Sequence, residues 1–447
     1  MGTPSPKSVS TKQRRIAKVA REAPDMVFTS LAHHIDLELL QEAHRRTRKT
    51  GAAGVDGQTA QEYATNLESN LQRLLDRFKA GTYRAPPVRR VEIPKGDGKS
   101  RPIGIPTFED KVLQRAVAMV LEAVYEQDFL DCSFGFRPGR SAHQALQALW
   151  DGLMAMGGGW VLEVDIEDYF GSLNHGQLRA FLDQRVRDGV LRRMIDKWLK
   201  AGVMRDGIVK HPETGTPQGG VASPILANIY LHEVLDLWFE RDVRPRLRGR
   251  SFLIRYADDA AIVFEKSDDA ERVLKVLAKR FAKYGLRLHP EKTRLVEFRS
   301  PGWRRRPNRG HRQTRPGSFD MLGFRHFWGR TRRGTWVVRR KTSPKKFSQA
   351  LKRISWWCRK YRHLPIEKQQ QALVKKLRGH YGYYGITGNI VALSRFLFEV
   401  WRVWRRWLHR RSQRAGMTWK RFERFRLRYP LPTPRIVHSV YRAQRSR

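Results

Sequence analysis

The most constraining feature of this sequence is a pair of adjacent aspartates inside an apolar segment. Asp258 and Asp259 follow Tyr256 and Ala257 in the middle of residues 252–264, which otherwise read as two apolar strands joined by a tight turn. Adjacent carboxylates repel each other, so a turn between two buried strands disfavours them unless a cation is held there. The plain alternative is a solvated Asp-Asp turn. The pattern predicts a β-hairpin with a cation site at its turn.

A third aspartate strengthens this interpretation. Asp165 comes at the end of another apolar, β-rich run that starts at Trp160. Side chains at neighbouring strand positions point to opposite sides, so one acid of the hairpin can bind a metal while the other lies nearby. Carboxylates of this kind can hold two Mg²⁺ ions together with substrate phosphates, activating a 3′-hydroxyl and stabilising a leaving pyrophosphate.

The distribution of charge points to a polyanionic partner. The chain carries 88 Lys and Arg against 43 Asp and Glu, a net charge of +45. Residues 301–447 hold 40 of these basic residues and 4 acidic ones. A run of charge can be a solvated face, but self-repulsion makes that unfavourable here without a bound anion. Nucleic acid is the leading candidate, and its binding should depend steeply on salt.

Composition excludes several other classes of protein. With 40% hydrophobic residues in 447, the chain can bury the cores of two or three domains. Two distant cysteines, Cys132 and Cys358, form no disulfide framework and no zinc module, which fits a reducing cytosol. No apolar run approaches the roughly 18 residues of a membrane span. No apolar stretch near the N-terminus resembles a secretory signal.

Hydrophobic periodicity predicts alternating helices and short strands, followed by a helical last third. Pairs of strands are expected at 88–93 with 103–106, and at 319–328 with 334–340; residues 1–23 read as a flexible basic lead. In the last third Trp404 should be core, and Trp356, Trp357, Trp401 and Trp407 are open between core and base stacking. The tail from Pro430 should be extended. Helices are predicted at residues 35–47, 60–79, 109–127, 141–156, 175–187, 190–201, 223–240, 268–284, 344–361, 366–383, 389–411 and 418–428.

Taken together, the motifs resemble those of the reverse transcriptase/maturase encoded by group II introns, in that family's order and over nearly the whole length. The matching segments are residues 54–57, 93–106, 133–141, 165–170, 215–224, 256–259, 285–292, 321–324 and 377–384. The resemblance implies an α+β right-hand polymerase, with fingers and an antiparallel palm sheet, followed by an α-helical thumb (domain X). It implies a flexible basic lead at 1–25, N-terminal extension and fingers at 26–155, palm at 156–340, and thumb with a basic tail at 341–447.

The resemblance also assigns roles that agree with the reading from residues. Asp165, Asp258 and Asp259 would be the catalytic residues that hold two Mg²⁺ ions, with the backbone carbonyl of Ile166 as an extra ligand. Lys95 and Arg101 would bind the triphosphate of the incoming dNTP, because cations suit a phosphoryl-transfer transition state.

Other residues would contact the nucleotide and the template. Phe170 would exclude a 2′-hydroxyl by steric clash, although core packing is a competing role and neighbouring Tyr169 is an alternative gate. Gln218 would contact the templating pair or the primer, where Gly219 permits close approach. Arg137 would touch the template or serve a structural role.

The implied partners are a group II intron RNA, in a ribonucleoprotein, an RNA template and a DNA primer or target. The arginines of the cationic last third expected to bind nucleic acid are Arg402, Arg405, Arg406 and Arg410. The expected function is RNA-directed DNA synthesis with assistance to splicing and intron mobility. The expected location is the bacterial cytosol, at the nucleoid when on target DNA, without a membrane.

Two alternatives remain open from the sequence. One is a splicing cofactor with little polymerase activity; the other is a domesticated relative serving antiphage defence or CRISPR adaptation. The last third offers no His and paired-Cys set for an endonuclease, which resembles the compact, endonuclease-lacking class C group.

Overall fold

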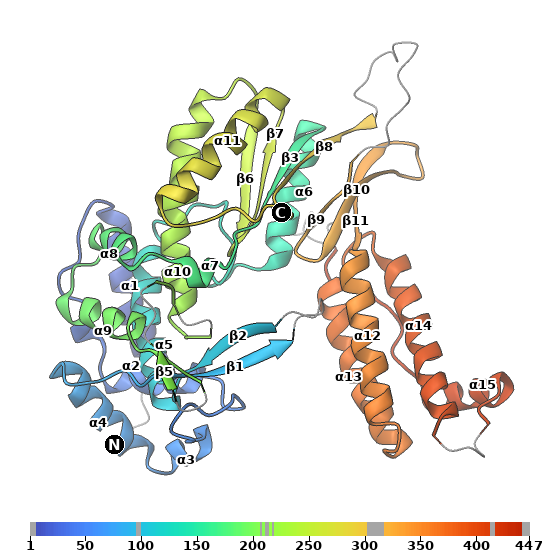
Figure 1. Ribbon diagram of the computed structural model, residues 1–447, viewed down its shortest axis with the longest axis horizontal. Coiled ribbons are helices and arrows are strands. Elements are labelled where there is room, and N and C mark those ends of the chain that lie inside the picture. The colour runs from blue at the N-terminus through green and yellow to red at the C-terminus, as the bar shows by residue number, and fades with distance from the viewer. Residues whose placement is uncertain are drawn as a thin grey trace. The chain divides into compact units, whose positions relative to one another are not determined.

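The computed structural model describes residues 6–94, 100–205, 208–210, 214–216, 219–301, 317–411 and 416–439. The chain divides into two compact units. The first comprises Met1–Ala145 with Leu162–Leu295, and the second comprises Leu146–Val161 with Val296–Arg447. The described residues form α-helices and mainly antiparallel sheets, so the predicted α+β class is confirmed (Figure 1).

The predicted helices are present, most within two or three residues of the expected bounds, except that the single helix expected at 60–79 is divided in two at Asn66. The α-helices are α1 Pro6–Glu22, α2 Leu37–Arg46, α3 Ala60–Thr65, α4 Leu67–Lys79, α5 Phe108–Tyr125, α6 Ala142–Met156, α7 Tyr169–Ser172, α8 His175–Asp183, α9 Gly189–Leu199, α10 Ser223–Leu231, α11 Ser267–Lys283, α12 Pro344–Lys360, α13 Ile366–Tyr384, α14 Ile390–His409 and α15 Trp419–Arg428. The strands are β1 Val88–Pro94, β2 Ser100–Ile105, β3 Gly158–Val164, β4 Val203–Arg205, β5 Ile208–Lys210, β6 Ser251–Tyr256, β7 Asp259–Phe264, β8 Arg294–Arg299, β9 Phe319–Met321, β10 Phe324–Arg330 and β11 Trp336–Thr342.

Local side-chain chemistry explains where several helices begin. The Asp36 carboxylate accepts a hydrogen bond from Leu39 N at the start of α2. Thr59 and Glu62 form a reciprocal capping box at the start of α3. Ser343 caps α12, whose first residue is Pro344, a position that tolerates proline. The predicted helix at 223–240 changes character instead: α10 ends at Leu231, and π-helical stretches continue it.

The expected flexible lead is wrong for residues 6–22, which form helix α1. Val9, Ile16 and Ala20 are 2%, 4% and 1% exposed, so one face of the helix is buried. Gln13 also donates to the carbonyl of Met119 on α5 over 3.0 Å. The many basic residues of this segment suggested a solvated, flexible lead. The spacing of its apolar residues along one helical face explains why a packed helix forms instead.

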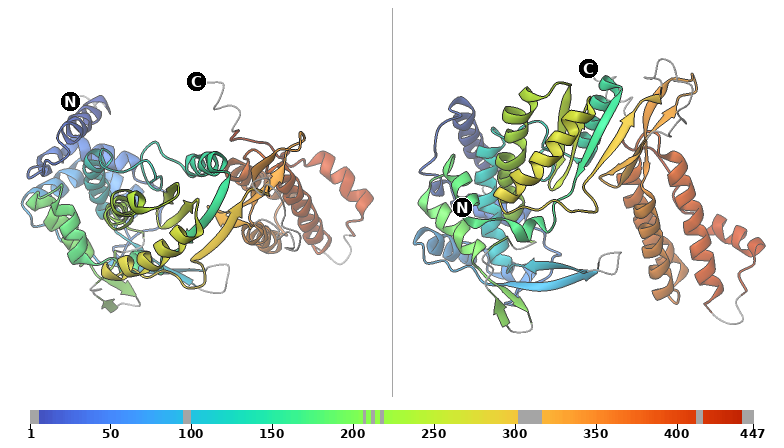
Figure 2. Two further views of the ribbon diagram at one scale, coloured as in Figure 1. Left: turned by 90° about the horizontal axis from the view of Figure 1, so that it is seen from above. Right: turned by 45° about the horizontal axis from the view of Figure 1, so that its top comes forward.

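Two sheets position the functional motifs. In the first, strand order is β2-β1-β4-β5, and β1 pairs antiparallel with β2, placing Ile93 opposite Arg101. The β1–β2 hairpin extends away from helices α2–α5 of the same unit (Figure 2). In the second, strand order is β6-β7-β3-β8, so the aspartate hairpin β6–β7 lies beside β3. Helix α11 packs on β7 through a face that buries Val273, Leu277 and Phe281.

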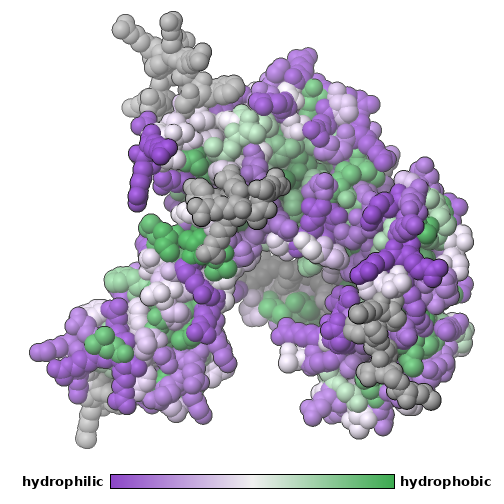
Figure 3. Space-filling view, turned by 180° about the vertical axis from the view of Figure 1, so that it is seen from behind, coloured by the Kyte–Doolittle hydropathy of each residue, from purple (hydrophilic) through white to green (hydrophobic). Residues whose placement is uncertain are grey.

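In the second unit, helices α12–α15 share one hydrophobic core. Residues that recur at helical spacing form an apolar stripe on α14 that packs into it: Leu393, Leu397, Val400, Trp404 and Leu408. Trp404 is 0% exposed, as expected for a core residue, and its indole N–H donates to Gln369 Oε1 over 3.0 Å. Over residues 430–439, the described part of the tail that was predicted to be extended, the backbone forms no helix, and its N–H groups at Val437 and His438 donate to the carbonyl of Gly385. Outside this core the helical unit presents a largely hydrophilic surface, with small apolar patches (Figure 3).

Candidate active site

The aspartate hairpin forms as predicted. Strands β6 and β7 pair antiparallel in a register that places Tyr256 opposite Asp259, leaving Ala257 and Asp258 as the two-residue turn. Ala257 has φ 58°, the left-handed conformation that such tight turns require. A Cβ on Gly135 would lie 2.2 Å from Ala257 N, so the loop containing Gly135 supports the turn by direct backbone contact.

A buried arginine anchors this turn from below. Arg255 is 0% exposed, and its five N–H donors have acceptors. Two of the bonds go to the carboxylate of Asp236, at 2.7 and 2.5 Å, and one goes to the carbonyl of Ala257 at 3.1 Å. Others go to Asn228 Oδ1 and Ser133 Oγ, from α10 and the loop after α5.

The electrostatics of this arginine favour its charged form. Burial acts to lower the pKa of Arg255, but the Asp236 carboxylate outweighs burial, so the pKa of Arg255 is raised. The sequence offered no local signal for this network, because its members are far apart along the chain.

Asp165 follows the last residue of β3, the strand beside β7. Asp259 is the first residue of β7, so Asp165 and the aspartate turn belong to neighbouring strands of one sheet. An antiparallel bridge joins Ile166 to Leu288 through the carbonyls of Asp165 and Arg287. That bridge leaves the Ile166 carbonyl outside its ladder bonds.

A cation that sequence reasoning missed lies beside this carboxylate. Lys292 Nζ is 3.1 Å from Asp165 Oδ1, with side chains that are 54% and 35% exposed. Its position at the end of the 285–292 motif was the available signal. Across the described ranges, no group of three or more His, Cys, Asp or Glu side chains is gathered as a metal site. The structure therefore places the three aspartates at the ends of neighbouring strands, Asp165 after β3 and the other two at the β6–β7 turn, without gathering them into a ligand cluster.

The two candidate sugar-gate residues occupy different environments. Tyr169 is 3% exposed, and its hydroxyl donates to the carbonyl of Ala227 on α10. Burial raises its pKa well above the ordinary value. Phe170 is half-buried, with its ring centroid 5.5 Å from that of Tyr169. Tyr169 is thus committed to the core, whereas Phe170 keeps an accessible ring.

The nucleotide-contacting candidates fall partly outside the described residues. Lys95 and Gln218 lie outside them, and for Arg101 the backbone position in β2 is described but not the side chain. Beside Gln218, Gly219 has φ +117°, and a Cβ there would lie 2.4 Å from the carbonyl oxygen of Gly104 on β2. The backbone at Gly219 therefore packs directly on β2, whereas the sequence had suggested that this glycine lets the nucleic acid approach closely.

A series of hydrogen bonds between buried polar side chains supports the 215–224 motif. Gln114 Oε1 on α5 accepts from Val221 N at 2.6 Å and from Ala222 N at 3.2 Å. Gln114 in turn donates to Asp110, which is 1% exposed and also accepts from Trp198. Burial raises the pKa of Asp110 to about 6, although these hydrogen bonds act to lower it. Both residues were missed, since a buried polar residue on an apolar helix carries no local signal.

Arg137 has the geometry of the structural role left open for it. Its side chain is 6% exposed, and it donates to the backbone carbonyls of Leu130 and Ser133, each over 2.8 Å. It also pairs with Glu126 and lies 5.2 Å from the ring centroid of Phe129. These contacts occupy the guanidinium inside the loop rather than presenting it to a template.

The four arginines proposed to bind nucleic acid differ in presentation. Arg402, Arg406 and Arg410 are exposed and recur every fourth residue; the first two lie on α14, and Arg410 directly follows its last residue. Arg405 instead covers the ring of Trp419, with its guanidinium carbon 3.8 Å from the centroid. The three exposed arginines form a cationic stripe. Within it, Arg402 forms an ion pair with Glu399 at 3.3 Å.

Comparison with known proteins identifies the class. Residues 93–326 match the reverse transcriptase (RNA-dependent DNA polymerase) family, and this segment is more than half of the 447 residues. The chain therefore belongs to the reverse transcriptase family.

Its curated relatives include proteins of group II introns. The group II intron-encoded protein LtrA of Lactococcus lactis is 37% identical over 245 residues, 52% of this chain and 40% of that protein. Protein YkfC of Escherichia coli is 35% identical over 247 residues, 54% of this chain and 65% of that protein. Nuclear intron maturase 2 of Arabidopsis thaliana is 33% identical over 81 residues, 18% of this chain and 11% of that protein.

The resemblance to group II intron reverse transcriptases and maturases is thus confirmed. The matches span less than two thirds of the length of each of these relatives. Among the helices of the described ranges, none is both long and apolar enough to cross a bilayer.

Proposed function

We propose that this protein is an RNA-directed DNA polymerase that also binds a group II intron RNA and assists its splicing and mobility. The observation that carries the proposal is the aspartate turn between β6 and β7, which the fully buried Arg255 anchors in a sheet whose neighbouring strand, β3, is followed by Asp165. A buried residue whose hydrogen bonds fix the turn can hold Asp258 and Asp259 in place, although their carboxylates repel each other.

The donor types that these aspartates offer fit Mg²⁺. Asp165, Asp258 and Asp259 would hold the ions with the carbonyl of Ile166, because carboxylate and carbonyl oxygens are the ligands that Mg²⁺ takes in proteins. When bound, Mg²⁺ supplies Lewis-acid activation of a 3′-hydroxyl and charge stabilisation at the leaving pyrophosphate. Around it, Lys95 and Arg101 would neutralise the triphosphate of the dNTP.

The neighbouring motifs would select and orient the nucleotide. Phe170 would lie under the sugar and exclude a ribose 2′-hydroxyl by clash. The tight contact of Gly219 on Gly104 would fix the segment that carries Gln218 against the fingers hairpin, where Gln218 would contact the templating pair. Gln114 would keep that segment in register through its bonds to the backbone at 221 and 222.

The cationic helical unit would hold the RNA. Arg402, Arg406 and Arg410 give α14 an exposed basic stripe suited to consecutive phosphates. Group II intron RNA is the proposed ligand because LtrA is a group II intron-encoded protein and a further relative is a nuclear intron maturase.

Primer extension tests the polymerase. The purified chain, given an RNA template, a DNA primer, dNTPs and Mg²⁺, is expected to extend the primer. A template that ends at the 3′ end of the primer, with no overhang to copy, should give no extension. Reversing the charge of Arg402, Arg406 and Arg410 should weaken RNA binding and flatten its salt dependence. Absence of extension by a well-folded preparation would contradict the proposed activity.

A further inference from the structure

The tryptophans that the sequence left open between core packing and base stacking differ in how deeply they are buried. Trp401 is 8% exposed, and Trp357 and Trp407 pack against the hydrophobic core of the helical unit. Trp356, which directly precedes Trp357 on α12, is 60% exposed. An indole so exposed contributes little to the core, so of the two roles considered for Trp356, core packing and base stacking, its exposure favours base stacking.

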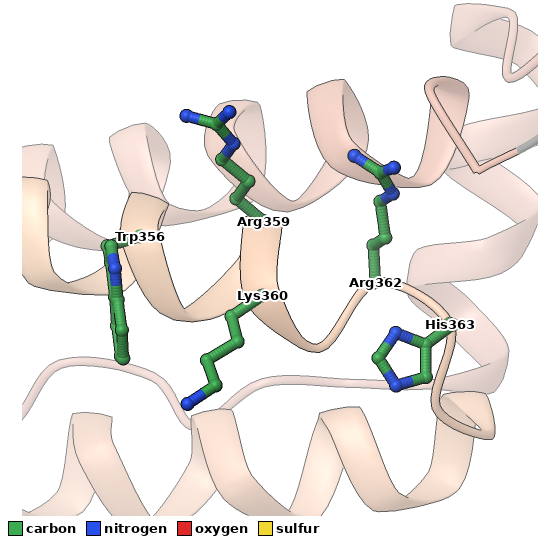
Figure 4. Close-up of a pocket in the computed structure, with 5 residues that line it drawn as sticks. All are labelled: Trp356, Arg359, Lys360, Arg362 and His363. Atoms are coloured by element: carbon green, nitrogen blue, oxygen red, sulfur yellow. The ribbon is translucent and has the colours of Figure 1, made fainter.

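Trp356 lies at the edge of a cationic pocket. The pocket has a volume of about 390 Å³ and is lined by Trp356, Arg359, Lys360, Arg362 and His363, from the last two turns of α12 and the loop that follows. Trp356 and Lys360 extend to one side of the chain, and Arg359 and Arg362 extend together to the other (Figure 4). Lys360 Nζ lies 5.2 Å from the centre of the Trp356 ring.

The basic side chains of this pocket lie in a segment without acidic residues. Residues 344–363 include seven Lys and Arg and no Asp or Glu. Of the four acids in residues 301–447, Asp320 pairs with Arg325, Glu399 pairs with Arg402, and Glu367 accepts from Tyr429. Within the described residues, none of the four basic side chains of the pocket forms an ion pair with a carboxylate. An anionic ligand would relieve their mutual repulsion.

We propose that this pocket binds one unpaired nucleotide of RNA, with the base stacked on Trp356, its phosphate held by Lys360, and the adjoining phosphate of the chain held by Arg359 and Arg362. The proposal rests on the RNA-binding function proposed above and adds a base-contacting subsite, on α12, to the phosphate-contacting stripe of α14. Guanidinium groups bind phosphate bidentately, and an aromatic ring accepts any base on its face.

The chemistry favours an unpaired nucleotide over a helix. In a duplex the base faces are covered by neighbouring pairs, so an exposed indole reaches them only where a base has left the stack. Lys352 and Arg353, one turn before Trp356 and also exposed, would continue the path of the backbone along α12.

Binding of short RNAs by the full chain tests the subsite, without dNTPs or primer. Trp356→Ala is expected to weaken binding of an unstructured RNA of about twelve nucleotides by roughly tenfold, and to leave binding of a blunt RNA duplex within about twofold. Trp356→Phe should retain most of the affinity. Arg359→Gln with Arg362→Gln should reduce the salt dependence of binding, because fewer counterions are released.

Trp419→Ala is the matched control. Trp419 is 56% exposed in the same unit, but its ring is covered by Arg405, so its removal should change single-strand binding much less than Trp356→Ala. Unchanged affinity for Trp356→Ala, or an equal loss for single strand and duplex, would overturn the stacking subsite. A loss confined to single-stranded DNA would overturn RNA as its occupant. These outcomes do not depend on primer extension, so failure of the polymerase proposal is read separately.

Discussion

Arg255 and Asp236 form a bidentate ion pair in which both side chains are 0% exposed, directly beneath the turn that presents Asp258. The pair links β6 to the π-helical stretch after α10, and the same guanidinium reaches the carbonyl of Ala257. A charge pair so deeply buried is costly to break, since either partner left by itself is an uncompensated charge in the interior.

Asp236→Asn should therefore destabilise the fold by about 3–5 kcal/mol, because it leaves the Arg255 charge buried without its counterion. Urea unfolding of the two proteins measures the difference. Arg250→Ala is the control: Arg250 pairs with Glu265 across the far end of the same hairpin, with side chains 57% and 33% exposed, and should cost less than about 1 kcal/mol. Equal losses in the two variants would contradict a special role for the buried pair.

Asp110 should make stability depend on pH. Burial raises its pKa to about 6 in the fold, whereas an unfolded aspartate has a pKa near 3.9. The native state then holds the proton more tightly, so this contribution to stability is fully present below about pH 4 and is lost as the pH rises through about 6. The loss should amount to about 2–3 kcal/mol.

Asp110→Asn removes this titration. Unfolding of wild type and variant across pH 4 to 7.5 should show their difference in stability shifting in favour of the variant as the pH rises. A difference that stays constant over this range would mean that the buried carboxyl does not titrate as described.

Lys292→Gln should lower the Mg²⁺ concentration needed for half-maximal primer extension by about fivefold, because an ammonium near Asp165 repels an incoming cation by about 1 kcal/mol. Stability should change little, since the pair is partly exposed. Arg294→Gln, which removes a cation that pairs with Glu163 on the neighbouring strand, is the control. An unchanged or higher Mg²⁺ requirement for Lys292→Gln would show that Lys292 does not act on the metal site.

Phe170→Ala should admit ribonucleotides about tenfold more readily relative to dNTPs, because the clash with a 2′-hydroxyl is removed. Single-nucleotide incorporation with matched rNTP and dNTP gives the ratio. Tyr169→Phe keeps the buried ring and loses only its bond to Ala227, so it should leave selectivity unchanged. A shift in Tyr169→Phe with none in Phe170→Ala would transfer the gate to Tyr169.

Local patterns predicted much of this fold, and contacts distant in sequence account for what was missed. The stripe on α14 that includes Leu393 and Trp404 and the hairpin around Asp258 follow from spacing and turn chemistry in one segment. By contrast, Arg255 draws its acceptors from Ser133, Asn228 and Asp236, which come together through packing of separate elements. Periodicity reports which face of an element is buried, but not which buried polar groups meet there.

The candidate site divides in the same way. The order of the motifs pointed to Asp165, Asp258 and Asp259, while the supports of those residues came from the structure. For Arg137 the sequence left template contact and a structural role open. Its guanidinium donates to carbonyls of its own loop, a contact that the sequence pattern does not reveal.

The most direct test of the proposed metal site is single-turnover primer extension on an RNA template by the Asp258→Ala, Asp259→Ala double variant. Its control is Asp131→Ala with Asp268→Ala, which removes two exposed carboxylates from other parts of the same unit. The double variant should lose at least about a thousandfold in rate while binding RNA as tightly as wild type, and the control should extend normally. Full extension by Asp258→Ala, Asp259→Ala would contradict the assignment of these carboxylates to catalysis.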